Sequence, residues 1–305
     1  MAQKSTKHRS EIHGLRGLAI VLVIAYHLWG AGRVSGGVDV FLMISAYLMT
    51  SSFLRQGTAF RILDFLVGRF RRLIPSSAVV ILAVCVLGWL ILPPTRWYPL
   101  LQQAIASLFY YQNSLLIDLA TDYTSPDRSG TSPLQHYWSL SIQGQVFVLW
   151  PLLLLVAIVL FRAFKIPLKA TLGTILATIT VASFWYAQGA IAEDPARAYF
   201  ETTARLWEFS LASLFAFVPV LRLPYRISAA VSWIGVTAVV TGGLIVGRAH
   251  FPGVAALWPS LAAALVIFAG GSTRRGHAAY WLSSRPLSWV GNRAYGLYLW
   301  HWPIL

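Results

Sequence analysis

Long apolar segments recur along the whole chain, and they restrict its fold more than any other feature. About 20 apolar residues are needed for a helix to cross the ~30 Å hydrocarbon core of a bilayer. Hydrophobic residues make up 57% of the 305 positions and charged residues only 11%, whereas a typical soluble domain is about 25% charged. A water-soluble fold would lack the charge to cover its surface. The sequence therefore predicts an all-α, polytopic membrane helix bundle.

Nine segments are predicted to cross the bilayer: 14–31, 37–54, 74–92, 138–161, 170–190, 203–220, 228–247, 252–270 and a last one from about 289. The last has only about 17 residues, so the chain is expected to be incomplete at its C-terminus. Segment 98–119 is apolar but carries several amides and one acid, which favours a re-entrant or interfacial helix. The first apolar run lacks a convincing cleavage site, which favours a retained anchor helix over a signal peptide.

The basic residues are distributed unevenly between the predicted loops. The chain has 24 Lys and Arg against 10 Asp and Glu, and membrane proteins collect Lys and Arg in cytoplasmic loops. With a cytoplasmic N-terminus, 16 basic residues fall in inner segments, five in outer segments and three in or beside spans. Topology therefore accounts for most of the positive charge without a nucleic-acid partner, and it predicts a cytoplasmic N-terminus.

Ionisable residues inside a predicted span are functional candidates, because they are costly in lipid. Arg16 and His27 are 11 residues apart, which at about 100° per residue puts both on one helix face, about 16 Å apart along the axis. Asp39 begins the second span and could orient His27. The alternatives are a snorkelling Arg16, a His27 hydrogen-bonded within the bundle, and an Asp39 favoured by the helix dipole.

Further polar clusters lie at the ends of other predicted spans. Arg69, Arg71 and Arg72 precede the third span, either as a positive-inside signal or as a site for the phosphates of a nucleotide-like donor. Arg205 and Glu208 share a face of the sixth span and could form a structural ion pair. The start of the fourth span is expected to line a polar cavity, through His136, Trp138, Ser139, Ser141, Gln143 and Gln145.

Taken together, these motifs resemble the membrane-bound acyltransferase-3 family, whose members O-acylate cell-envelope glycans and lipids. The resemblance covers essentially the whole chain, 1–305, as one domain, with no extracytoplasmic domain expected within it. The matching motifs are Gly14-Leu15-Arg16 with His27, Gly37 to Ala46, the arginine cluster ending at Pro75, His136 to Ser141 with Gln145, Arg205-x-Trp207-Glu208, and Asn292 with Tyr298 to Pro303.

The chain departs from the family pattern at three positions. Gln143 stands where the family usually has an acid, which resembles an actinobacterial envelope-modifying subgroup. His13 replaces a common Asp, and Ala46 replaces a Gly. The family normally continues for at least one more span, and some members carry an extracytoplasmic SGNH-hydrolase-like domain.

The resemblance implies an integral O-acyltransferase of the bacterial cytoplasmic membrane. It would move an acyl group, typically acetyl, from cytosolic acyl-CoA to a hydroxyl of an extracytoplasmic sugar or lipid-linked sugar. Acetyl-CoA would be a co-substrate, with no bound cofactor and no metal. His27 would act as general base or transient acyl carrier, with its tautomer fixed by Asp39 or Glu208.

The remaining candidate residues take two implied roles. Arg16, Arg69, Arg71 and Arg72 would bind the phosphates of acyl-CoA. A second group would line the cavity or stabilise the thioester oxyanion: His136, Trp138, Ser139, Ser141, Gln143, Gln145, Arg205, Tyr298 and His301.

Two other classes of protein stay open at this stage. A multi-pass transporter or lipid flippase would also place ionisable residues in its spans, but it would predict symmetry between halves, and the sequence has no such repeat. A non-catalytic scaffold would not need Arg16 and His27 on one face. The identity of the acceptor and the oligomeric state do not follow from the sequence.

Overall fold

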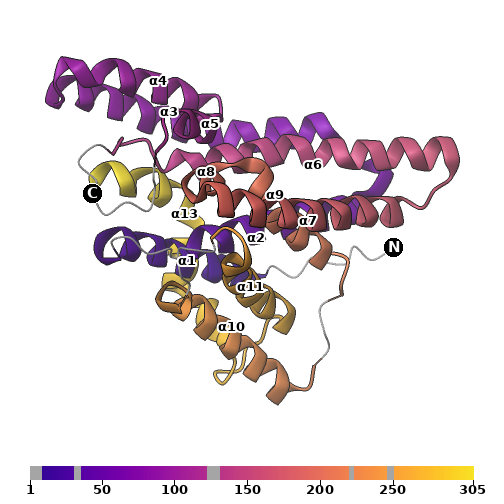
Figure 1. Cartoon of the computed structure of the whole chain (residues 1–305). Helices are drawn as coiled ribbons and strands as arrows, with labels where there is room; N and C mark the ends of the chain where they lie inside the picture. Colours follow the sequence, from indigo (N-terminus) through magenta and orange to yellow (C-terminus); the bar gives the residue numbers. More distant parts are fainter. Residues whose placement is uncertain (1–8, 31–35, 122–130, 220–222, 246–250) are drawn as a thin grey trace.

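The fold is built from helices throughout the part of the chain that the structure describes. The computed structural model describes residues 9–30, 36–121, 131–219, 223–245 and 251–305, and these residues form α-helices and short 3-10 helices without a strand (Figure 1). Helices satisfy their own backbone hydrogen bonds, which suits a chain with so few polar side chains. The predicted all-α class is therefore confirmed.

Six helices in the described residues are long and apolar enough to cross a membrane. They are α1 (Ser10–Trp29), α2 (Gly37–Gln56, continued by the short η1, Gly57–Ala59), α3 (Ile62–Ile91), α6 (Tyr137–Phe164), α7 (Leu168–Glu193) and α10 (Tyr225–Ile245). Their outward side chains include exposed Leu82 on α3 and exposed Trp185 on α7. These six helices are consistent with a multi-pass membrane protein.

The prediction of nine spans is not confirmed. Helices α9 (Thr202–Phe215) and α11 (Leu257–Ala269, preceded by η4, Val254–Ala256) have 14 and 13 residues, or about 20 Å each, which is shorter than a bilayer core. Helix α13 (Arg285–Ile304) is 20 residues long, but it carries two arginines, an asparagine and a histidine. These polar residues lower its hydropathy below that of the six long helices.

Segment 98–119 forms two helices, α4 (Trp97–Leu108) and α5 (Gln112–Asp118), after η2 (Pro94–Arg96). Between them Tyr110 adopts a left-handed backbone conformation with φ of 61°, which ends α4 and turns the chain. The expected re-entrant or interfacial placement of this segment is not confirmed. The short helices α8 (Pro195–Phe200) and α12 (Ala278–Leu282) complete the described elements.

Helix α3 begins a dozen residues before the predicted third span. Pro75, expected near its start, lies inside the helix. Proline removes one backbone hydrogen bond and usually kinks or ends a helix in water, whereas membrane helices tolerate it because neighbouring groups satisfy the freed carbonyl. The three arginines before Pro75 are therefore on a helix, with Arg69 and Arg72 on adjacent positions of one face and Arg71 turned away from them.

Helix α1 packs directly against α12 and α13 (Figure 1). A Cβ on Gly14 would overlap the backbone carbonyl of Leu282, and a Cβ on Gly291 would overlap that of His13. Glycines at these crossings let the backbones approach closely, as small residues do between membrane helices. This contact holds the Arg16 and His27 face of α1 next to the C-terminal half of α13.

Helix α9 lies in the interior, in contact with α2, α7 and α11. Its buried side chains include Trp207, and Trp138 and Trp150 of α6 belong to the same core. Packing on several sides explains how a helix with Arg205 and Glu208 can be central.

Six of the basic residues that entered the topology count lie outside the described residues: Lys4, Lys7, Arg33, Arg128, Arg222 and Arg248. The cytoplasmic placement of the N-terminus stays a prediction.

Candidate active site

Two histidines from opposite ends of the chain meet at the centre of the site. His27 lies in the last turn of α1 and His301 in the last turn of α13. His27 Nδ1 and His301 Nε2 are 2.9 Å apart, and their rings stack with centroids 5.0 Å apart. Trp302 packs edge-on against His27 at 4.7 Å between ring centroids. His27 is half-buried and His301 is buried.

The hydrogen bonds of this pair define the tautomer of each neutral ring. His301 Nδ1 lies 2.6 Å from the backbone oxygen of Tyr298, and it must donate because a carbonyl oxygen only accepts. His301 Nε2 then accepts from His27 Nδ1, so neutral His27 carries its proton on Nδ1 and its lone pair on Nε2. His301 therefore lies beside His27, whereas Asp39 and Glu208, the partners predicted for His27, bind Arg205.

His136 extends the histidine cluster from the start of α6. Its Nε2 lies 3.1 Å from the backbone oxygen of Leu299, and its ring centroid is 5.4 Å from that of His301. The His136 side chain is completely buried.

A tyrosine and a serine connect the histidines with a cavity. The Tyr298 hydroxyl donates to the backbone oxygen of His136 at 3.0 Å. The Ser139 hydroxyl is 2.7 Å from the Tyr298 hydroxyl and 3.5 Å from the same backbone oxygen of His136. Both side chains line the cavity described next.

The cavity has a volume of about 60 Å³ and lies between α1, α2, α6 and α13. This volume corresponds to about two water molecules or one small acyl group. Its polar lining comes from Arg16, Ser45, Ser139, Gln143 and Tyr298. Gln143 Nε2 donates to Ser45 Oγ at 2.7 Å. Sequence reasoning missed Ser45, although it lies within the motif at the start of the second span.

Arg16 belongs to a group of like charges. It lies within electrostatic range of Arg72 and Arg69, and Arg69 stacks over Phe147 at 4.8 Å. Among the described residues, no carboxylate lies within 4.0 Å of any of these three guanidiniums. Such a group is suited to a multiply charged anion. Arg71 is exposed on another face of α3 and does not join it.

Arg205 is buried, and two carboxylates compensate its charge. Arg205 Nη2 lies 2.5 Å from Asp39 Oδ1 and 3.0 Å from Glu208 Oε2, and all three side chains are at most 1% exposed. The guanidinium also stacks on Trp138 at 5.1 Å, within a shell of aromatic rings. This arrangement ties α2 to α9, because removing one partner would leave a buried charge uncompensated.

Two predicted cavity residues instead hold α5 against the bundle. Gln145 donates to the backbone oxygen of Tyr110 and to Asn113 Oδ1, each at 2.9 Å, and accepts from Thr202 Oγ1 at 2.6 Å. Ser141 Oγ accepts from the backbone N–H of Gln112 at 3.1 Å. Sequence reasoning did not identify this network, because its members lie far apart in the chain.

Comparison with known proteins identifies the class. The family described as an acyltransferase domain, acyltransferase-3, matches residues 9–305. The chain therefore belongs to this family of acyltransferase enzymes. Membership favours the enzyme over the transporter and scaffold alternatives.

Particular relatives narrow the class further. The chain is 33% identical to the peptidoglycan O-acetyltransferase OatA of Listeria monocytogenes over 99% of its own length and 50% of that protein. It is 31% identical to the putative peptidoglycan O-acetyltransferase YrhL of Bacillus subtilis, over 100% and 50%. It is 32% identical to the putative membrane-bound transacylase BcsY of Komagataeibacter xylinus, over 97% and 72%. The chain thus spans about half the length of the first two relatives. No solved structure matches it.

Proposed function

We propose that this protein transfers an acyl group, typically acetyl, from a cytosolic acyl-CoA to a hydroxyl of an extracytoplasmic cell-envelope glycan. One observation carries the proposal: the His27–His301 pair is linked through Tyr298, whose backbone oxygen binds His301, to a cavity that Tyr298 and Arg16 line. Family membership and relatives that are named O-acetyltransferases support the reaction class.

The lone pair of His27 Nε2 performs the proton transfer in this proposal. The acceptor hydroxyl donates its proton to Nε2 while its oxygen attacks the thioester carbonyl carbon. The carbon–sulfur bond then breaks, and the leaving thiolate takes the proton from the imidazolium. An imidazole suits this exchange, because its unperturbed pKa lies near neutral pH.

The same nitrogen could also carry the acyl group. In that variant Nε2 attacks the thioester, the coenzyme A thiolate leaves, and the acceptor hydroxyl then takes the acyl group from the acyl-imidazole. Both variants need the His27 proton on Nδ1, which is the tautomer that His301 favours. Acid quenching of an acetyl-labelled enzyme, followed by peptide mass spectrometry, separates them.

Arg16, Arg69 and Arg72 are proposed to bind the phosphates of the donor. Arg205 is less suited to this role, because Asp39 and Glu208 already compensate its charge. Arginine favours phosphate because its planar guanidinium donates two parallel hydrogen bonds.

Gln143 is proposed to stabilise the thioester oxyanion. Its amide has two N–H donors, of which one binds Ser45, so the other can point to a developing negative charge. A carboxylate, which the family usually has here, could not donate in this way unless protonated. The departure at Gln143 is thus compatible with acyl transfer.

The test uses the full chain, purified in detergent and reconstituted in nanodiscs. The release of free coenzyme A from acetyl-CoA, and the transfer of labelled acetyl to peptidoglycan fragments, are measured for the unmodified protein and for His27→Ala. We expect His27→Ala to lose both activities while its melting temperature stays close to that of the unmodified protein. Full activity in His27→Ala would remove this residue from the mechanism.

A further inference from the structure

The first half of α3 carries Arg69 and Arg72 and contacts the bundle along one narrow face. Between residues 62 and 74 the half-buried side chains recur every three to four positions, and the side chains between them are exposed. Phe65 packs against Phe53 of α2 with ring centroids 5.6 Å apart. The position of this segment therefore depends on few contacts, and it sets where the two arginines lie.

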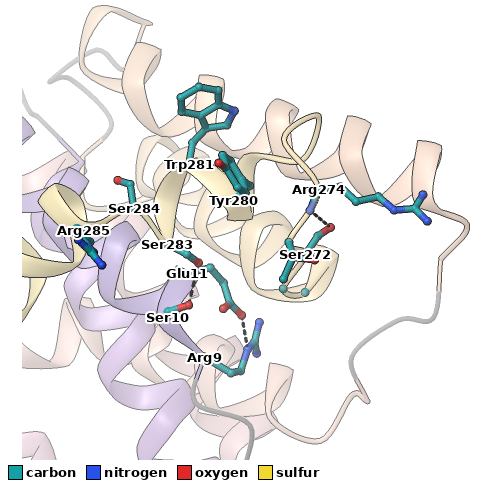
Figure 2. Close-up of a pocket in the computed structure, with 13 residues that line it drawn as sticks. Arg9, Ser10, Glu11, Ser272, Arg274, Tyr280, Trp281, Ser283, Ser284 and Arg285 are labelled. Atoms are coloured by element: carbon teal, nitrogen blue, oxygen red, sulfur yellow. Dashed lines mark hydrogen bonds and ion pairs between the residues drawn. The ribbon is translucent and has the colours of Figure 1, made fainter.

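Three like charges meet at this segment. Arg16 of α1 lies within electrostatic range of Arg69 and Arg72, and no described carboxylate lies within 4.0 Å of any of the three. Arg9 differs, because in the pocket where α1 begins it binds Glu11 at 2.7 Å (Figure 2). Like charges repel, so the arginine group acts to separate α3 from α1 unless other contacts oppose it.

Pro75 weakens the connection between the two halves of α3. Proline has no backbone N–H, so the carbonyl four residues earlier in an α-helix loses its hydrogen bond. In α3 that carbonyl belongs to Arg71. The segment with the arginines is thus joined to the rest of the helix by one backbone hydrogen bond fewer, and its placement relies more on neighbouring helices.

A tyrosine of α13 holds the backbone of α3 just before this proline. The Tyr295 hydroxyl donates to the backbone oxygen of Leu73 at 3.0 Å, across 222 residues of sequence. Leu73 directly follows Arg72 in the chain. The Tyr295 side chain also lines the same cavity as Arg16. One residue therefore contacts both the helix that carries two of the arginines and the cavity that the third one lines.

A second tyrosine makes an equivalent bond on the other side of the proline. The Tyr137 hydroxyl, from α6, donates to the backbone oxygen of Ser77 at 3.3 Å. The second half of α3 also buries Val80 and Val84 in the same apolar cluster as Tyr137, so packing holds this half in place as well. Tyr137 is therefore a matched comparison for Tyr295, because only Tyr295 bonds the half with the arginines.

We infer that Tyr295 is a positioning residue of the donor site. Its hydroxyl ties the first half of α3 to α13 against the repulsion within the arginine group, and so keeps Arg69 and Arg72 beside Arg16. Charges that are already grouped cost less to arrange when a polyanion binds. The inference rests on the proposed function for the identity of that anion, acyl-CoA, whereas the tether itself can be measured without any ligand.

The first measurement is the distance between α3 and α10 by pulsed electron spin resonance, on the full chain in nanodiscs without ligand. Spin labels are attached at two exposed positions, Val67→Cys and Ile227→Cys, after the single cysteine is removed by Cys85→Ala. Tyr295→Phe keeps the ring and removes the hydroxyl, and Tyr137→Phe is the matched control. We expect Tyr295→Phe to lengthen or broaden the distance distribution and Tyr137→Phe to leave it unchanged.

The second measurement is the KM for acetyl-CoA, with kcat and the melting temperature of each variant. Tyr295→Phe should raise KM about fivefold, the effect of one neutral hydrogen bond, and change kcat less than about twofold. Tyr137→Phe should change both less than about twofold. In a chain that already carries Arg69→Gln and Arg72→Gln, Tyr295→Phe should raise KM less than about twofold further, because it acts through these arginines.

An unchanged distance distribution in Tyr295→Phe would overturn the inference. Equal changes in Tyr137→Phe would overturn it as well, because they would assign both hydroxyls to general packing, and so would a full effect on KM in the chain without Arg69 and Arg72. A displaced α3 with an unchanged KM would retain the tether and contradict the donor site of the proposed function. The two measurements therefore separate failure of the tether from failure of the proposed function.

Discussion

Removing the imidazole of His301 tests whether it positions His27. In His301→Ala the Nδ1 proton of His27 loses its acceptor at 2.9 Å, and the stacked ring at 5.0 Å disappears. The His27 ring can then rotate, and its proton can move to Nε2, where it would block proton abstraction. His301→Gln offers a carbonyl oxygen as a replacement acceptor and should restore part of the order.

The expected magnitude lies between two limits. A neutral hydrogen bond contributes about 1 kcal/mol, which corresponds to about fivefold in rate. Loss of the partner that orients a metal-bound histidine costs 10–100-fold in comparable sites. We therefore expect His301→Ala to lower kcat by about five- to a hundredfold. His27→Ala should lose more, about 10²–10⁴-fold, because general acid–base catalysis as a whole is removed.

The assay is a double-mutant cycle on acetyl-CoA turnover, with the melting temperature of each variant measured in the same detergent. If His301 acts only through His27, the His27→Ala/His301→Ala double variant should be as active as His27→Ala alone, within about twofold. His301→Gln should lie between His301→Ala and the unmodified protein.

Additive losses in the double variant would refute this reasoning, because they would show that His301 acts without His27. A His301→Ala variant with unchanged kcat would refute it as well. A lowered kcat accompanied by a large drop in melting temperature in His301→Ala, but not in His301→Gln, would assign the residue to packing.

Three further predictions concern the charges of the protein. Arg16→Gln should raise KM for acyl-CoA about tenfold or more with a smaller change in kcat, because a charged contact to phosphate is lost. The control, Arg226→Gln at an exposed position, should leave KM unchanged. An equal rise in KM in both variants would show that Arg16 has only a topological role. Arg205→Met should destabilise the protein by about 3–5 kcal/mol, because it leaves two buried carboxylates uncompensated, whereas Asp39→Asn should cost less; thermal unfolding measures both, and the reverse order would contradict the ion cluster. Burial lowers the pKa of His277, so the unfolded chain binds a proton at this residue at higher pH than the folded chain does. The free energy of unfolding should therefore fall as the pH drops below about 6.5. Between pH 8 and pH 5 the melting temperature of His277→Gln should decline less than that of the unmodified protein, and an equal decline would exclude this histidine as the cause.

Local sequence was sufficient to predict much of the helical framework. The apolar runs at α1, α2, α6, α7 and α10 are long and uninterrupted, and hydrophobicity over 20 residues has few other outcomes in a bilayer. Local sequence predicted the helix boundaries poorly where a local signal competes with packing between helices. Pro75 suggested a helix start, yet it lies inside α3, because a proline in a bundle can be accommodated by its neighbours. Helix α9 has 14 residues, since interior packing rather than bilayer thickness sets its length.

The site shows the same division. The common face of Arg16 and His27 follows from helical geometry alone, and the motifs of the family follow from the residues. The partner of His27 does not, because His301 is 274 residues away and meets it only through the close packing of α1 on α13. Asp39 was expected near His27 because they are close in sequence. Its place beside Arg205, 166 residues away, results from the need of a buried guanidinium for carboxylates.

By itself, the sequence determined that the chain is an all-helical membrane protein of the acyltransferase-3 type, because composition and short motifs are local properties. Only the tertiary structure decided which charged side chains pair with one another and which have no carboxylate beside them. It compensates Arg205 with two carboxylates, groups Arg16 with Arg69 and Arg72, and stacks Arg274 over Tyr225. The physical reason is that the electrostatic energy of a charged side chain depends on its burial and on the charges near it. Both are set by contacts between helices that lie far apart in the chain.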